Sequence, residues 1–265
     1  MRIRAVVAAV SGALTLSALA VPASQASSPA FAPARTDAAP VISKAVVNSG
    51  KPIVLGTTAT KKVTVSVTAS HPSGIKDALS YIWRGRESNP KLYDFGFHPE
   101  AGRATCKAAN TTTSTCTLTI TVDPGYLWNT NATTWRVYAG AWGKDGNFTE
   151  KETFSSVRFQ RLSRLTVNAS PEPVKKGGTI TVTGKLDRAN WDTRKYAGYA
   201  SQSVKLQFRK KNSSTYTTVK TVKGSHTGTL RTTVKAVEDG YWRWSFAGTA
   251  STPAVNAAGD FVDVK

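Results

Sequence analysis

The chain has 265 residues, 40% of them hydrophobic, and 35 Lys and Arg against 16 Asp and Glu, a formal net charge of +19. This hydrophobic fraction excludes a disordered chain, and the length exceeds the roughly 100 to 200 residues of one ordinary domain. Two Cys, three His and one Met leave little material for a metal site. We therefore expect two globular domains, with no metal and no other cofactor.

Residues 1–26 have the pattern of an export signal. Arg2 and Arg4 precede a run of apolar and small residues, and Ser24-Gln25-Ala26 offers small residues at a cleavage position. The apolar run is shorter than the roughly 20 residues that a membrane span needs, and no second such run follows. We expect cleavage of this segment, a flexible leader over residues 27–40, and a secreted protein, extracellular or loosely associated with the envelope, without a transmembrane segment.

Beyond residue 40, apolar residues alternate with Thr, Ser and Lys at a period of two, which is typical of half-buried strands. The clearest cases in the first half are two runs: Val63, Val65 and Val67, then Leu118, Ile120 and Val122. No window of this region has a convincing helical period. The pattern predicts an all-β protein.

A boundary is expected near Arg161 to Arg164, where one strand-like run ends and a new one begins before two prolines. The alternation then resumes in three runs: Ile180 and Val182; Val204, Leu206 and Phe208; Trp242, Trp244 and Phe246. Two units of this size with short strands and frequent turns predict tandem β-sandwiches, over residues 41–160 and 161–265.

Three segments carry a family resemblance. The run from Thr68 to Ile75 resembles an Ala-x-Asp-x-Ser-Gly-Ile/Val loop, with His71 in place of the acid, and Ala141 with Asp145-Gly146-Asn147 resembles a late Ala-x-Asp-x-x-Gly-Asn turn. The segment from Glu238 to Trp244 is similar to the Asp-x-Gly-x-Tyr-x-Cys sequence that opens strand F. The chain thus resembles the bacterial immunoglobulin-like modules of secreted actinobacterial proteins.

The resemblance implies tandem immunoglobulin-like sandwiches and says little about activity, because such folds host many functions. It places Trp242 at the position of the tyrosine corner and Trp244 at the position of a conserved cysteine. No inter-sheet disulfide can therefore form at that point of the second sandwich.

The two cysteines, Cys106 and Cys116, are separated by a polar run with turn-forming residues. In an exported protein an even number of cysteines favours a disulfide. We expect Cys106 and Cys116 to pair across a hairpin.

A search for catalytic groups finds no convergent set. His71, His98 and His226 fall in expected turns and are interpreted as surface or turn residues, and the nucleophile and metal-protease motifs are missing from the sequence. We expect the protein not to be an enzyme. A site built from carboxylates distant in sequence remains an alternative, since spatial pairing cannot be read from sequence.

The positive charge is concentrated in residues 161–265, which hold 18 Lys and Arg against 7 Asp and Glu. If the apolar residues of this segment face the core, then Lys205, Arg209 and Lys211 point to solvent along one strand. Arg243 is expected beside them on the neighbouring strand. Three further lysines are expected to extend this surface, with a bulge near Val219: Lys185, Lys220 and Lys223.

Lys205, Arg209, Lys211 and Arg243 are therefore the candidate ligand-binding residues. Such a surface attracts polyanions, and the expected partner is an anionic wall polymer or polysaccharide, with nucleic acid bound only nonspecifically. A role of the charge in solubility and in protecting sheet edges stays open.

Aromatic residues provide a second hypothesis, a carbohydrate-binding module. Alternation places Trp135, Trp242 and Trp244 in the core. Aromatic residues nearer to turns are candidates for contact with sugar rings: Trp128, Trp142, Trp191, Tyr196 and Tyr199. The sequence as a whole favours a noncatalytic secreted binding or adhesion protein. A carbohydrate-binding module, a dispersed enzyme site and a structural or protein-partner role remain alternatives.

Overall fold

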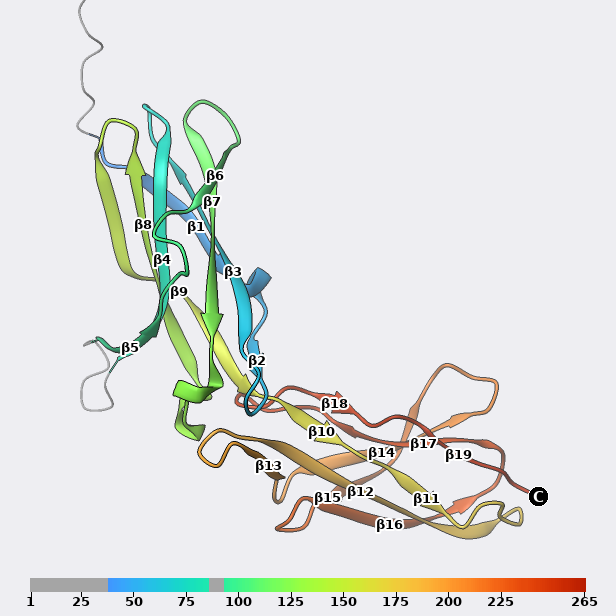
Figure 1. Cartoon of the computed structure of the whole chain (residues 1–265). Helices are drawn as coiled ribbons and strands as arrows, with labels where there is room; N and C mark the ends of the chain where they lie inside the picture. The colour runs from blue at the N-terminus through green and yellow to red at the C-terminus, as the bar shows by residue number, and fades with distance from the viewer. Residues whose placement is uncertain (1–37, 86–92) are drawn as a thin grey trace, which may run out of the picture. The chain divides into compact units, whose positions relative to one another are not determined.

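The computed structural model describes residues 38–85 and 93–265, most of them in β-strands (Figure 1). The expected signal peptide, residues 1–26, and residues 27–37 of the expected leader lie outside the described residues. None of the helices within the described ranges has the length and apolarity to cross a membrane. The all-β class that the sequence predicts is confirmed.

Two sheets, antiparallel except for the pairing of one short strand, form the N-terminal sandwich. The first has the order β1 (Val41–Val47), β3 (Lys61–Ser70), β7 (Thr113–Val122), β6 (Thr105–Ala108). The second has the order β2 (Ile53–Leu55), β9 (Phe148–Arg161), β8 (Thr134–Gly143), β4 (Ile75–Gly85), β5 (Tyr93–Phe97). Three short 3-10 turns join them: η1 (Asn48–Gly50), η2 (Pro124–Tyr126) and η3 (Asn129–Asn131).

Two sheets also form the C-terminal sandwich. In the first, β12 (Gly178–Asn190) pairs with four strands: β10 (Ser163–Leu165), β11 (Asn168–Ser170), β13 (Lys195–Gly198) and β16 (Thr229–Ala236). In the second, β17 (Gly240–Phe246) pairs with β14 (Ser203–Lys210), β18 (Val255–Asn256) and β19 (Asp260–Val262), and β15 (Thr217–Lys223) adds to β14.

The strand order is that of the immunoglobulin fold. In the N-terminal sandwich the sheet β1-β3-β7-β6 corresponds to strands A, B, E and D, and β9-β8-β4 to strands G, F and C. The strand β2 pairs in parallel with β9, through Ile53 and Phe159. An isolated parallel bridge between Val174 and Val264 repeats this contact in the C-terminal sandwich. The immunoglobulin-like fold expected from the resemblance is thus present in the pairing of the chain's own strands.

The alternating residues form the cores as expected. In the N-terminal sandwich Val65 of β3 and Ile120 of β7 are fully buried. In the C-terminal sandwich Trp242 and Trp244 of β17 are buried, as Trp135 is on β8. Burial of one such aromatic side chain stabilises the fold by about 2–3 kcal/mol relative to its exposure.

The strand-F resemblance has a measurable consequence at Trp242. The indole Nε1 of Trp242 is buried and has no hydrogen-bond partner within the described part of the chain. The corner hydrogen bond that a tyrosine makes at this position is therefore not replaced. Trp244, at the cysteine position, instead donates a hydrogen bond from Nε1 to the carbonyl oxygen of Thr183 at 3.0 Å.

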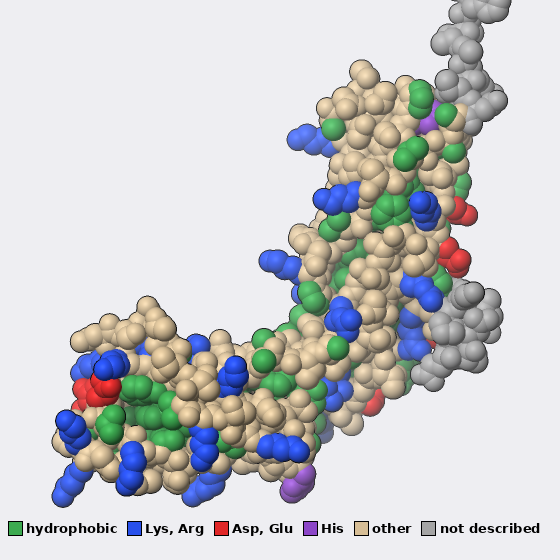
Figure 2. Space-filling view, turned by 180° about the vertical axis from the view of Figure 1, so that it is seen from behind, with side chains coloured by type: hydrophobic (Ala, Val, Ile, Leu, Met, Phe, Trp, Pro, Cys, Tyr) green, Lys and Arg blue, Asp and Glu red, His purple; other side chains and the backbone are tan. Residues whose placement is uncertain are grey.

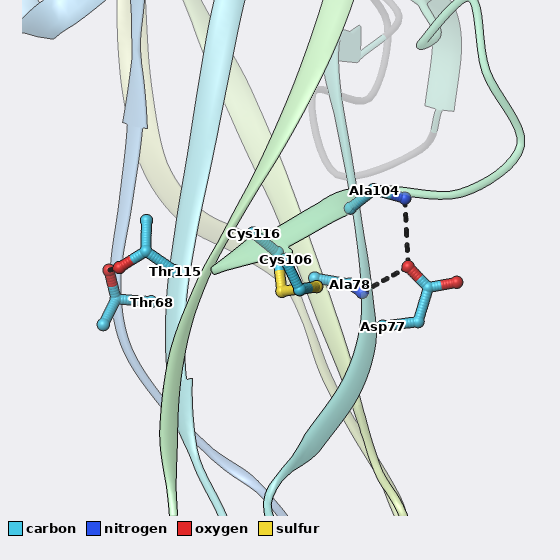
Figure 3. The surroundings of a disulfide bond; sticks show 7 residues. All are labelled: Thr68, Asp77, Ala78, Ala104, Cys106, Thr115 and Cys116. Atoms are coloured by element: carbon cyan, nitrogen blue, oxygen red, sulfur yellow. Dashed lines mark hydrogen bonds between the residues drawn. A yellow bond between two sulfur atoms is a disulfide. The ribbon is translucent and has the colours of Figure 1, made fainter. Parts of the chain in front are cut away.

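Cys106 and Cys116 form a disulfide, as predicted from their spacing (Figure 3). The two residues are direct cross-strand partners of β6 and β7, so the bond lies within one sheet. Beside it, an oxygen of the Asp77 carboxylate accepts hydrogen bonds from the backbone N–H groups of Ala78, at 2.8 Å, and Ala104, at 3.0 Å. Asp77 thereby fixes the entry of β6 against β4.

The hairpin between β12 and β13 contributes to the core cluster of the N-terminal sandwich. Trp191, at the tip of this hairpin, is fully buried in that cluster, and its Nε1 donates to the carbonyl oxygen of Gly56 at 2.8 Å. The interpretation of Trp191 as a loop residue available to a ligand is therefore wrong. Although Trp191 lies at the tip of a polar loop of the C-terminal sandwich, its side chain packs in the core of the N-terminal sandwich.

Candidate ligand-binding surface

Strand register places three of the four predicted basic residues on one face of the C-terminal sandwich. On β14, Lys205 and Arg209 alternate with the buried Leu206. On β17, Arg243 is paired with Gln207, the residue midway between them. Side chains that alternate with buried residues point away from the core, so Lys205, Arg209 and Arg243 share the outer face of this sheet.

Lys211 lies one residue beyond the end of β14. Its Nζ is 5.3 Å from the ring centre of Phe261 on β19. The backbone N–H of Lys211 donates to the carbonyl oxygen of Asp239 at 3.0 Å. Lys211 therefore adjoins the same face, on a turn instead of on the strand.

Aromatic rings, which the predicted patch did not include, separate these cations. The guanidinium of Arg243 lies 3.7 Å from the ring centre of Tyr216, and that of Arg209 lies 3.8 Å from the ring centre of Tyr241. The rings of Tyr241 and Phe261 are 5.1 Å apart. We call this set the cation–aromatic ladder: Arg243, Tyr216, Arg209, Tyr241, Phe261 and Lys211.

Hydrogen bonds fix the two guanidinium groups of the ladder. Arg243 donates from Nε to Gln207 Oε1 at 2.9 Å, and Arg209 donates from Nη1 to the carbonyl oxygen of Ser213 at 2.7 Å. The two terminal nitrogens of Arg243, Nη1 and Nη2, have no hydrogen-bond partner among the described residues. A planar, stacked guanidinium with open N–H groups is prepared for bidentate contact with a phosphate or carboxylate.

The acidic side chains near the ladder are confined to one end of it. Lys210 pairs with Glu238 at 3.1 Å and Lys211 with Asp239 at 3.4 Å. Lys205, Arg209 and Arg243 form no ion pair within the described part of the chain. Figure 2 shows Lys and Arg side chains spread over the C-terminal sandwich, around exposed hydrophobic side chains.

Of the three lysines expected to extend this surface, one lies on the same face and two do not. Lys223 pairs with Ser203 on the same face as Lys205. Lys185 lies on β12 in the other sheet, 3.2 Å from Asp187, and Lys220 reaches Thr232 of β16 at 3.0 Å. Lys185 and Lys220 therefore do not extend the ladder. A register shift after Leu206 confirms the bulge predicted near Val219.

Two of the loop tyrosines proposed for sugar contact have covered ring faces. The guanidinium of Arg164 lies 3.2 Å from the ring centre of Tyr196, and that of Arg188 lies 3.7 Å from the ring centre of Tyr199. Arginines that occupy these faces compete with any stacked ligand.

Trp142 and Trp128 differ in exposure. Trp142 is partly buried and stacks on Phe148, with 4.4 Å between ring centres. Trp128 is 63% exposed. Among the proposed loop aromatics, Trp128 is thus the tryptophan with the most open side chain.

One cluster brings a hydroxyl, an imidazole and a carboxylate together. The Nδ1 of His71 is 2.8 Å from Ser73 Oγ, and its Nε2 is 3.5 Å from Asp145 Oδ2 and 2.6 Å from the carbonyl oxygen of Ala38. The His71 side chain is fully buried, so its interpretation as a surface residue is wrong, although it does lie in a turn. The two motifs of the family resemblance meet here, and the imidazole links them to Ala38.

Sequence reasoning missed the aromatic members of the ladder. Tyr241 and Phe261 each precede a buried residue, Trp242 and Val262, so strict alternation assigns both rings to the outer face. Tyr216 precedes its strand, and no periodicity marks it. The signal for Tyr241 was therefore available in the sequence, whereas the position of Tyr216 depends on the fold.

Comparison with protein families gives one partial match. The model of DUF5707, a family of unknown function, matches residues 54–141. This segment begins in β2 and ends in β8 of the N-terminal sandwich. A comparison with curated proteins found no significant match.

Several solved structures are similar at low identity. Dimeric latent PorU from Porphyromonas gingivalis aligns with 87% of this chain at 12% identity and a TM-score of 0.29, and the chain spans 20% of that protein. The D00-D0 domain of Intimin aligns with 83% of this chain and 99% of its own length, at 15% identity and a TM-score of 0.28. The mouse nectin-like molecule 4 ectodomain covers 85% of this chain and 64% of its own, at 13% identity and a TM-score of 0.25. These TM-scores are too low to support any inference about function, so the function proposed for this chain rests on its own residues alone.

Proposed function

We propose that this chain is a noncatalytic, exported binding protein that engages anionic polymers of a cell envelope or matrix through the cation–aromatic ladder. The polymer contributes phosphate or carboxylate groups, and the arginines of the ladder bind them. Nucleic acid, as another polyanion, binds to the same surface without sequence preference.

The observation that carries this proposal is the stacking of Arg209 and Arg243 on tyrosine rings. A flexible surface arginine loses side-chain entropy when it binds an anion. Here Tyr241 and Tyr216 already hold the two guanidinium planes, so less entropy is lost for each contact with a ligand. A positive charge that served solubility alone requires no such order.

A polymer suits this surface better than a single small anion. One exposed ion pair contributes only about 0–1 kcal/mol. Arg209, Arg243 and Lys205 lie on adjacent strands of one face, so a chain with repeated anionic groups can contact several of them at once. Linked contacts of this kind raise the total affinity well above that of each site.

Paired charge variants test the proposal. The double variant Arg209→Gln/Arg243→Gln removes two charges from the ladder, and Arg231→Gln/Lys235→Gln removes the same number from exposed positions of β16 in the other sheet. Binding to polyphosphate and to polygalacturonate is measured by calorimetry at low salt. We expect the ladder variant to bind more than about tenfold more weakly and the β16 variant to bind nearly as well as the parent protein.

Two results would contradict the proposal. Equal losses in the two variants would assign binding to net charge without a defined site. Undetectable binding of the parent protein to both polymers would leave the charge with a role in solubility. A preference for one polymer would distinguish phosphate from carboxylate as the bound group.

A further inference from the structure

Two aromatic side chains are strongly exposed on the loop that joins β7 to β8. Tyr126 is 62% exposed and Trp128 is 63% exposed, while Leu127 between them is fully buried. Because Leu127 points into the core, its two neighbours project outward. Five of the other six tryptophans of the chain are buried and Trp142 is partly buried, so the exposure of Trp128 is exceptional in this protein.

The backbone that carries these rings is held in one conformation. Asp123 Oδ1 accepts a hydrogen bond from the N–H of Gly125 at 2.6 Å, and Asn131 Oδ1 accepts one from the N–H of Trp128 at 2.7 Å. The N–H of Leu127 donates to the carbonyl oxygen of Pro124 at 3.0 Å. The aromatic pair is therefore preorganised, which reduces the entropy lost when a ligand binds.

The hairpin between β12 and β13 supports the same loop. The guanidinium of Arg194 donates to the carbonyl oxygens of Pro124, Gly125 and Leu127. Asn129 receives further support, because its N–H donates to Asp192 Oδ1 at 2.8 Å. These contacts occupy N–H donors of Arg194, which keeps its positive charge, and leave the rings of Tyr126 and Trp128 exposed.

We propose that Tyr126 and Trp128 form a contact site for the sugar rings of an uncharged glycan, separate from the cation–aromatic ladder. The flat rings offer apolar faces, and the Tyr126 hydroxyl and the Asp192 carboxylate offer hydrogen-bonding groups to sugar hydroxyls. The carboxylates of Asp123 and Asp192 adjoin the loop and disfavour an anionic ligand. Arg194 adds one positive charge beside these two carboxylates, so the loop has no excess of cations like that of the ladder.

A neutral glycan fits this site better than a protein partner does. A stable protein interface buries at least about 1,000 Å² around an apolar centre. Among the described residues, the other strongly exposed large hydrophobic side chains belong to different elements: Val41, Phe148, Leu162, Val219 and Val237. The ring centre of the partly buried Phe95 lies 6.4 Å from that of Tyr126, so the exposed apolar area is limited to Tyr126 and Trp128 and matches the size of one or two sugar units.

The test follows the indole N–H signal of Trp128 by NMR during titration with cellohexaose, chitohexaose and xylohexaose, at low and at high salt. The signal is assigned with Trp128→Phe. We expect at least one of the three sugars to shift this signal independently of salt. By calorimetry, which does not need the indole signal, we expect Trp128→Ala and Tyr126→Ala each to weaken binding by about tenfold, while Val237→Ala, which truncates another exposed apolar residue, leaves binding unchanged.

A Trp128 signal that none of the three sugars moves at about 10 mM, well above the range of weak specific binding, overturns the inference. Binding that persists in both aromatic variants also overturns it. Because Arg209→Gln/Arg243→Gln leaves this loop intact, failure here is distinguishable from failure of the polyanion proposal.

Discussion

Asp239 connects the ladder to the C-terminal end of the described chain. Its Oδ1 accepts a hydrogen bond from the backbone N–H of Val264 at 2.8 Å, and its Oδ2 lies 3.4 Å from Nζ of Lys211. The hydrogen bond from Val264, followed by that from Lys211, holds the pKa of the Asp239 carboxyl below its ordinary value of 3.8. The ionised form is thus favoured in the folded state.

This pKa shift predicts how Asp239→Asn responds to pH. Since the folded pKa is depressed, the contribution of Asp239 to stability is fully present above the unfolded pKa near 3.8 and is lost as pH falls through the folded pKa. We expect the variant to be less stable than the parent protein at pH 7, and we expect this difference to shrink as the pH falls below 3.8. Urea denaturation across this pH range measures the difference, and a difference that does not shrink would contradict this role.

At the scale of the elements, the period-two pattern was sufficient to predict β3, β7, β12, β14 and β17. Each of these strands carries apolar residues on one face and Thr, Ser, Lys or Arg on the other, and the structure buries the apolar set, as at Val65 and Trp244. The same pattern placed Lys205, Arg209 and Arg243 on one outer face. Strand alternation is local, so it can be read without knowledge of the fold.

The position of Trp191 could not be predicted in this way. Its partner Gly56 is 135 residues away in the sequence, and a tryptophan at a polar loop tip has the same local pattern whether it enters a distant core or faces solvent. Tyr216 and His71 present the same difficulty, because their surroundings come from separate elements. Long-range contacts of this kind determined which aromatic residues remained open to a ligand.

The disulfide gives a prediction at the level of one hairpin. Cys106 and Cys116 close a loop of sequence separation 10, for which chain entropy predicts a contribution of about 2–3 kcal/mol. We expect Cys106→Ser/Cys116→Ser to lower the free energy of unfolding by this amount while leaving binding at the ladder unchanged. Guanidinium denaturation of the variant provides the test, and a loss of ladder binding would show that the bond affects more than the N-terminal sandwich.

At the scale of the whole molecule, the hairpin between β12 and β13 links the two cores. Beside Trp191, the Nε of Arg161 donates to the carbonyl oxygen of Ala189 at 2.6 Å. Burial, with repulsion from nearby Arg188, lowers the pKa of Arg161 to about 10, and the group remains charged at neutral pH. Arg161, where the sequence predicts the domain boundary, is thus buried and hydrogen-bonded to the hairpin between β12 and β13.

We expect Trp191→Ala to lower the free energy of unfolding by about 3–5 kcal/mol, because it opens a cavity in the N-terminal core and removes the hydrogen bond to Gly56. Trp191→Phe retains most of the ring volume, so its loss is expected to be smaller. Denaturation followed by near-ultraviolet circular dichroism measures both variants. A loss below about 1 kcal/mol for the alanine variant would mean that the hairpin does not stabilise this core.

The central claim, that the ladder binds anionic polymers, is tested most directly by the salt dependence of polyphosphate binding. If three or four cations of the ladder face neutralise phosphates, the logarithm of the association constant falls with the logarithm of salt concentration at a slope of about −2 to −3. The Arg209→Gln/Arg243→Gln variant is expected to reduce the magnitude of that slope by about 1.4, at about 0.7 for each lost contact. A slope near zero, or one that this variant leaves unchanged, would contradict the claim.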